Sequence, residues 1–166
     1  MTTNEGARLA DSIRQKVEKM NGLCNGLSEE KASRAPEGRW SPKQIISHLW
    51  GPEGGGLLPA LRLILEQEIP LIDLKAEDPF FTGKRTSMTM SELLAEFRKE
   101  YIQIADLVSG LSEVQLQRKA HIPMLKETEL GEYPTLVSFV GGLTDYHMDF
   151  HIKHMQEIIQ ALGDQT

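Results

Sequence analysis

Apolar residues recur at helical spacing in several parts of the chain. Steps of three and four place such residues on one face of an α-helix. The first stripe lies in residues 5–27, and a later one follows a capping box formed by Thr89 and Glu92. The two stripes consist of Leu9, Ile13, Val17, Met20, Cys24 and Leu27, and of Leu94, Phe97, Tyr101, Ile104, Val108 and Leu111. Each stripe predicts a long amphipathic helix.

A second helix is predicted to begin at Ser41. Ser41 can cap the helix, Pro42 fits its first position, and Gln44 completes a capping box. Trp40 before the cap and Ile45 at the fourth helical position form the pattern of a hydrophobic staple. This start signal is local and strong, so we expect the helix to run for about two turns beyond it.

The second helix is expected to pass His48 and to end near Trp50. Residues 51–56 read Gly-Pro-Glu-Gly-Gly-Gly, which breaks or kinks a helix. A helical pattern resumes over residues 57–67. Residues 69–88, with Pro70, Pro79 and Gly83, read as a connection.

The last helix is predicted to begin near Thr135 and to follow one face to the end of the chain. Residues 112–134 before it read as a mixed connection. The stripe of this helix consists of Leu136, Val140, Leu143, His147, His151, His154 and Ile158. No stretch shows the alternation of a β-strand. The sequence therefore predicts an all-α, four-helix bundle made of a single domain, residues 1–166.

Composition excludes several classes of protein. The chain has 166 residues and a net charge of -6, and an acidic surface repels the phosphate backbone of nucleic acids. The apolar runs are interrupted by charges, so no membrane span is expected. The start of the chain lacks the apolar core of a signal peptide, and we expect a cytoplasmic protein by elimination. The single cysteine, Cys24, lies on an apolar stripe and is read as a buried thiol rather than a nucleophile.

Two histidines of the last helix stand four residues apart. That spacing places the rings of His147 and His151 one turn apart on one face, where both can reach one ion at about 2.0–2.1 Å. His48 of the second helix can supply a third ligand. Two plainer interpretations remain open. Such a pair also occurs on the solvent-exposed face of a helix, and a lone buried histidine is often only hydrogen-bonded.

Two stretches of the sequence resemble the DinB/YfiT-like metalloenzyme family. The first is RWSPKQIISHLW, residues 39–50, and the second is GEYPTLVSFVGGLTDYHMDFHIKHMQEI, residues 131–158, with its His-x3-His signature. The resemblance implies a bundle of up-down-down-up type with long connections. It also implies one metal ion held by His48, His147 and His151.

The same resemblance implies a function. Relatives include S-transferases that use low-molecular-weight thiols and a thiol-dependent isomerase. We therefore expect a divalent-metal-dependent enzyme, with Zn, Ni or Fe, that acts on a small molecule as an S-transferase or hydrolase. A low-molecular-weight thiol cosubstrate and a homodimer are part of this expectation. The alternatives are a non-catalytic, metal- or ligand-binding stress-response protein and a purely structural dimeric bundle.

The chain departs from the family pattern at two places. Residues 51–56 interrupt a helix that the family commonly continues, which either widens the mouth of the site or is only a kink. His154 stands where the family often has glutamine, and it is read as a partly solvated residue, a neighbour of a ligand or an alternate ligand. His121 is read as a surface residue. Glu53, Asp145 and Asp149 lie near the histidines in sequence, but none is assigned as a general base.

Overall fold

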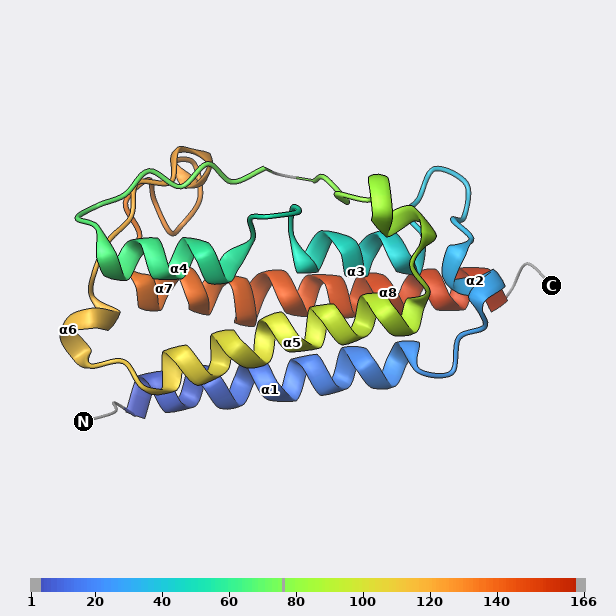
Figure 1. Ribbon diagram of the computed structural model, residues 1–166, viewed down its shortest axis with the longest axis horizontal. Coiled ribbons are helices and arrows are strands. Elements are labelled where there is room, and N and C mark those ends of the chain that lie inside the picture. The colour runs from blue at the N-terminus through green and yellow to red at the C-terminus, as the bar shows by residue number, and fades with distance from the viewer. Residues whose placement is uncertain (1–3, 76, 164–166) are drawn as a thin grey trace.

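The computed structural model describes residues 4–75 and 77–163, and it consists of four rods packed side by side (Figure 1). The first three rods begin where the sequence predicts, and the second is interrupted between two helices. They are α1 (Asn4–Cys24), α3 (Pro42–Trp50) with α4 (Leu57–Glu66), and α5 (Met90–Ser109). The capping boxes predicted at Ser41 and Thr89 are both formed.

The fourth rod is continuous but not uniformly α-helical. It comprises α7 (Leu136–Gly141), η3 (Gly142–Met148) and α8 (Asp149–Gly163), and η3 is a π-helix. This corrects the prediction of one regular α-helix. The buried positions of the π-helical stretch explain the difference, because they follow one another in two successive steps of four with no step of three between them. These positions are Val140, Thr144 and Met148. A stretch with more residues per turn keeps such positions facing inward, as a π-helical turn does.

The rods run in the up-down-down-up order. In Figure 1, α1 and the rod that ends in α8 run in one direction, whereas α3, α4 and α5 run in the other. The connection between α4 and α5 therefore returns along the whole bundle, over the outside of α4 and α3. The predicted fold class and its long connections are confirmed.

Short helices lie in the segments that the sequence left as connections. They are α2 (Glu29–Ser33), η1 (Gly83–Ser87), α6 (Glu113–Leu116) and η2 (Pro123–Leu125). Ser28 accepts a hydrogen bond from the backbone amide of Lys31 and caps α2. Between residues 4 and 163, residue 76 aside, the chain forms isolated β-bridges but no strand.

The break at residues 51–56 is a tight closure between α3 and α4. Gly51 and Gly56 have φ angles of 94° and 107°, and a Cβ on Gly51 would lie 3.1 Å from the Cα of Gly56. Tyr101 of α5 donates to the carbonyl of Leu49 at 3.0 Å. The kink is therefore closed by glycine backbone and held by α5, and it leaves His48 in the last turn of α3.

The core agrees with the predicted stripes. Cys24 is buried, with 1% of its surface exposed, as expected for a structural thiol. No helix in the described part of the chain is both long and apolar enough to cross a membrane. The ends of the predicted 1–166 domain, residues 1–3 and 164–166, lie outside the described residues, as does residue 76.

Candidate metal centre

Three histidines from different parts of the fold meet inside the bundle. His48 comes from the last turn of α3, His147 from the π-helical segment η3, and His151 from the first turns of α8. One ring nitrogen from each lies within 4.8 Å of the other two. The Nε2 atoms of His48 and His147 are 3.1 Å apart. Two nitrogens bound to one tetrahedral ion at about 2.0–2.1 Å are separated by roughly 3.3 Å, so this spacing suits a shared ion.

His48 is oriented by a backbone carbonyl. Its Nδ1 donates to the carbonyl of Asp78 at 2.7 Å, which fixes the proton on Nδ1. In the neutral ring, the lone pair is then on Nε2, the nitrogen that faces His147. The ring of Phe80 lies parallel to that of His48, with centroids 6.2 Å apart. The outer nitrogen of a metal-binding histidine ordinarily makes this kind of contact.

Asp78 and Phe80 belong to a segment of residues 77–80, here called the strap, in the connection between α4 and α5. Glu77 and Phe80 both have positive φ angles, 51° and 50°. Such angles are unfavourable for residues other than glycine and persist where the surroundings enforce them. Two hydrogen bonds do so: the Phe80 amide donates to Oδ1 of Asp78 at 2.8 Å, and the Ser47 hydroxyl donates to the Phe80 carbonyl at 3.1 Å.

Burial keeps the other two imidazoles neutral. Desolvation, with a further contribution from His48, lowers the pKa of His147 to about 4. Desolvation also lowers the pKa of His151 to about 2, aided by the neighbouring histidines. A neutral ring offers a lone pair, which is the form that binds a metal.

His147 carries a buried ring nitrogen that lacks a hydrogen-bond partner. Its Nδ1 is buried and has no hydrogen-bond partner among the described residues. If the proton is on Nδ1, the lone pair of Nε2 points toward His48. If the proton is instead on Nε2, the 3.1 Å contact with His48 is an N–H···N hydrogen bond. An ion would favour the first form, so the donor set fits a bound metal.

His154 lies beside the cluster rather than in it. Its Nδ1 is 3.3 Å from the Nδ1 of His151, so it contacts the outer side of that ring. Of the alternatives predicted for His154, the structure supports a half-buried residue that contacts the ligand candidate His151. Trp40 stacks parallel to His151 with centroids 6.4 Å apart, and Phe150 meets it edge-on at 5.0 Å. Trp40, expected from the sequence as part of a staple, thus also lines the site.

A cavity of about 510 Å³ opens beside His151. Trp40 and Phe150 supply aromatic walls, while Arg39 and Lys153 supply positive charges at its edge. Glu77 and Glu157 also line this cavity, so both signs of charge are present. The volume is in the range that accommodates a small molecule.

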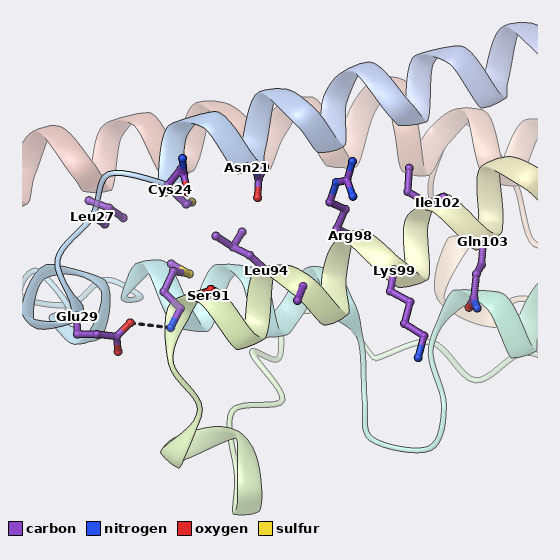
Figure 2. A pocket seen from close by; sticks show the side chains of 13 residues that line it. Asn21, Cys24, Leu27, Glu29, Ser91, Leu94, Arg98, Lys99, Ile102 and Gln103 are labelled. Carbon is purple, nitrogen blue, oxygen red and sulfur yellow. Dashed lines mark hydrogen bonds between the residues drawn. The ribbon is translucent and has the colours of Figure 1, made fainter.

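A second cavity of about 570 Å³ lies between α1 and α5, away from the histidines (Figure 2). Cys24 is at its base, and burial raises the pKa of this thiol to about 12. Glu29 at one end accepts a hydrogen bond from the Met90 amide at 2.8 Å. The Cys24 thiol is therefore not ionised near neutral pH.

The remaining candidates are engaged elsewhere. Oε1 of Glu53 lies 3.9 Å from Nε of Arg85, and Lys16 pairs with Asp145 and Asp149 at 3.2 Å each. Within the described residues, the metal-binding group found at this place consists of histidines only.

His121 is also outside the cluster. Its Nε2 lies 3.0 Å from a carboxylate oxygen of Glu132, and its ring stacks on Tyr133. The structure thus brings together the three predicted histidines and leaves His121 apart.

The fold resembles that of a solved protein, and the sequence matches the model of a protein family. The structure is similar to YfiT from Bacillus subtilis, described as "a probable metal-dependent hydrolase with an unusual four-helix bundle topology". The TM-score is 0.77 at 20% sequence identity, over 98% of this chain and 90% of that one. No curated protein matches the chain. The model of the DinB superfamily matches residues 13–161, so this chain is a member of the DinB superfamily.

Proposed function

We propose that the protein is a divalent-metal-dependent enzyme in which His48, His147 and His151 hold one ion and a small molecule reacts beside it. The observation that carries this proposal is the convergence of three ring nitrogens within 4.8 Å, from two buried histidines and the partly buried His147. Burying such rings without partners is unfavourable, and a shared ion would compensate all three. The metal dependence described for YfiT supports the same conclusion.

Three neutral ligands would leave the full charge of the ion available to a fourth group. When bound, such an ion lowers the pKa of a coordinated water or thiol and so supplies a nucleophile near neutral pH. Zn, Ni and Fe all accept imidazole ligands. The chain's own residues would bind and orient: Trp40 and Phe150 would hold the substrate against His151, and the strap would hold His48 with Nε2 available as a ligand.

The reaction proposed is hydrolysis or thiol-dependent S-transfer on a small electrophile. The cavity beside His151 has room for a substrate and charged groups at its edge, which supports catalysis over a closed structural site. In S-transfer, the attacking group is a low-molecular-weight thiol; in hydrolysis, it is water. The two differ in whether turnover requires added thiol.

The first test is the metal content of purified, untagged protein by elemental mass spectrometry. Wild type should contain close to one transition-metal ion per chain, and His147→Ala should lose it. His121→Ala is the matched control, because His121 pairs with Glu132 outside the cluster, and it should keep the metal. A wild-type protein that stays metal-free after reconstitution would refute the proposal.

The second test separates the proposed reactions. Metal-loaded wild type and His147→Ala are assayed on activated esters without thiol, and on small electrophiles with cysteine or glutathione. Metal-dependent turnover that needs the thiol identifies an S-transferase, and turnover without it identifies a hydrolase. Bound metal with no turnover in either assay would favour the non-catalytic, metal-binding alternative.

A further inference from the structure

Arg85 is a buried arginine close to the histidine cluster. It lies in η1, and only 1% of its surface is exposed. Its Nη1 donates to the carbonyl of Ser47 at 3.1 Å and to the Ser47 hydroxyl at 3.0 Å. Its guanidinium carbon lies 3.9 Å from the centre of the Trp50 ring. Burying a guanidinium is unfavourable unless its contacts compensate for lost hydration, so these contacts with α3 are expected to matter.

The same guanidinium also reaches the strap. Nη1 of Arg85 lies 3.5 Å from the Phe80 carbonyl, which accepts a further hydrogen bond from the Ser47 hydroxyl. Arg85 and Ser47 thus join the end of the strap to α3. Two residues earlier in the strap, the Asp78 carbonyl accepts the Nδ1 proton of His48. A short chain of contacts therefore leads from Arg85 to the ring of His48.

The loop at residues 51–56 completes this arrangement. Nε of Arg85 is buried and without a hydrogen-bond partner among the described residues, and Oε1 of Glu53 is 3.9 Å from it. The helix break therefore brings a negative charge toward the buried guanidinium. Glu53 therefore lies beside the Arg85 guanidinium, and we do not assign it as a general base.

We propose that Arg85 is a positioning residue of the metal centre: it fixes the strap against α3, so that the Asp78 carbonyl holds His48 with its proton on Nδ1 and Nε2 toward His147 and His151. The value of this device for metal binding rests on the proposed function. The arrangement of His48 itself does not, because it follows from the contacts of Arg85 with Ser47, of Ser47 with Phe80, and of Asp78 with His48.

The chemistry of arginine suits this role better than that of lysine. The planar guanidinium donates to Ser47 while its face lies on Trp50, whereas an ammonium group has no such face. The strained backbone at Glu77 and Phe80 also needs anchoring contacts to persist. Arg85→Lys should therefore keep the charge but hold the strap less well.

The first experiment measures the tautomer of His48 in metal-free protein by ¹⁵N nuclear magnetic resonance of the imidazoles. Wild type should show His48 protonated on Nδ1. Arg85→Met and Ser47→Ala should show this form mixed with the Nε2 tautomer. Arg118→Met is the matched control, because Arg118 donates to the carbonyls of Ile64 and Gln67 near α4 and α6 and should leave His48 unchanged.

The second experiment measures metal affinity by competition with a chromophoric chelator, at a temperature where each variant is folded. Loss of a contact to the outer nitrogen of a ligand typically weakens metal binding by about 10–100-fold. Arg85→Met is expected to reach the lower end of this range and Arg118→Met to match wild type. Arg85→Met and Arg118→Met should both lower the free energy of unfolding, so a loss of stability alone cannot produce the difference in metal affinity.

The outcomes separate this inference from the proposed function. A folded Arg85→Met protein with the wild-type tautomer and affinity would overturn the role of Arg85. If Arg85→Met does not fold, the His48 tautomer and the metal affinity of Arg85→Lys and Ser47→Ala test the role of Arg85 by the same criteria. If wild type binds no metal, the proposed function fails, and the tautomer measurement still decides whether Arg85 positions His48.

Discussion

Burial determines the charge of the cluster histidines. It lowers the pKa of His147 to about 4 and that of His151 to about 2, from an ordinary value of 6.5. In the unfolded chain, both residues return to the ordinary value. Between about pH 6.5 and pH 4, the unfolded chain therefore binds more protons than the folded chain, and the free energy of unfolding rises with pH in this window.

Metal-free protein should accordingly lose stability as the pH falls from 7 to 5. Each of the two histidines contributes at most about 1.4 kcal/mol per pH unit below its unfolded pKa. Urea unfolding at several pH values measures the slope. His151→Gln should flatten it, because the proton uptake of His151 on unfolding is then lost. An equal free energy of unfolding at pH 5 and pH 7 in wild type would contradict this prediction.

The sequence identifies some residues of the site and not others. His48, His147 and His151 lie on helices whose periodicity and motifs are visible in the chain, and the structure brings these three together. Asp78 and Arg85 lie in the 69–88 connection, where no periodicity indicates a direction for any side chain. Their roles depend on how that connection folds over α3, which local patterns do not encode.

The π-helical segment η3 is held by one face of α1. Arg8, Ser12 and Lys16 are spaced by four residues, and all three contact the carboxylate of Asp145, at 3.5, 3.1 and 3.2 Å. Nζ of Lys16 also donates to the Thr144 carbonyl at 3.0 Å. A π-helical turn is a rare local geometry often found at functional sites. These contacts with α1 stabilise the turn that carries His147.

Lys16→Met should loosen this segment while preserving the bundle. The change removes the donor to Thr144 and one partner of Asp145 but keeps most of the aliphatic stem. Hydrogen exchange of the amides of residues 142–148 should become faster, and metal affinity should fall. Lys19→Met, an exposed change on the same helix, is the control. Equal exchange rates in both variants and wild type would show that Lys16 does not hold the turn.

The capping box at the start of α3 is a local feature that can be predicted from the sequence. Ser41 accepts from the Gln44 amide at 3.2 Å, and the Gln44 side chain accepts from the Ser41 amide at 2.7 Å. Ser41→Ala should lower the free energy of unfolding by about 1 kcal/mol, because it removes the cap of a helix. Chemical denaturation measures this loss. Ser33→Ala, at an exposed position in α2, should change stability little, and a similar loss in both variants would contradict a capping role.

Capping boxes can be recognised from four residues, whereas the π-helical turn cannot. The boxes at Ser41 and Thr89 are satisfied within their own helices. The geometry of η3 depends on α1, more than a hundred residues away in sequence. The buried positions that accompany it, Val140, Thr144 and Met148, are known only from the structure, because the predicted stripe placed Leu143 rather than Thr144 on the inward face.

At the scale of the molecule, the arrangement of the rods creates the site. α3 and α8 lie in contact, so the ends of remote helices bring His48 to His147 and His151. The long connection between α4 and α5 passes over α3 and supplies the strap (Figure 1). Periodicity alone predicts four helices, but the family resemblance was needed for the order of their directions. The tight closure between Gly51 and Gly56 also required the structure, because a glycine run indicates a break without its shape.

The most direct test of the metal centre is the X-ray absorption spectrum of zinc-loaded protein. The account predicts three imidazole nitrogens at about 2.0–2.1 Å and one further light atom. His48→Ala should reduce the count to two imidazoles, and His121→Ala should leave it at three. A wild-type spectrum with fewer than three imidazoles, or one that His48→Ala does not change, would contradict the central claim that His48, His147 and His151 hold one ion together.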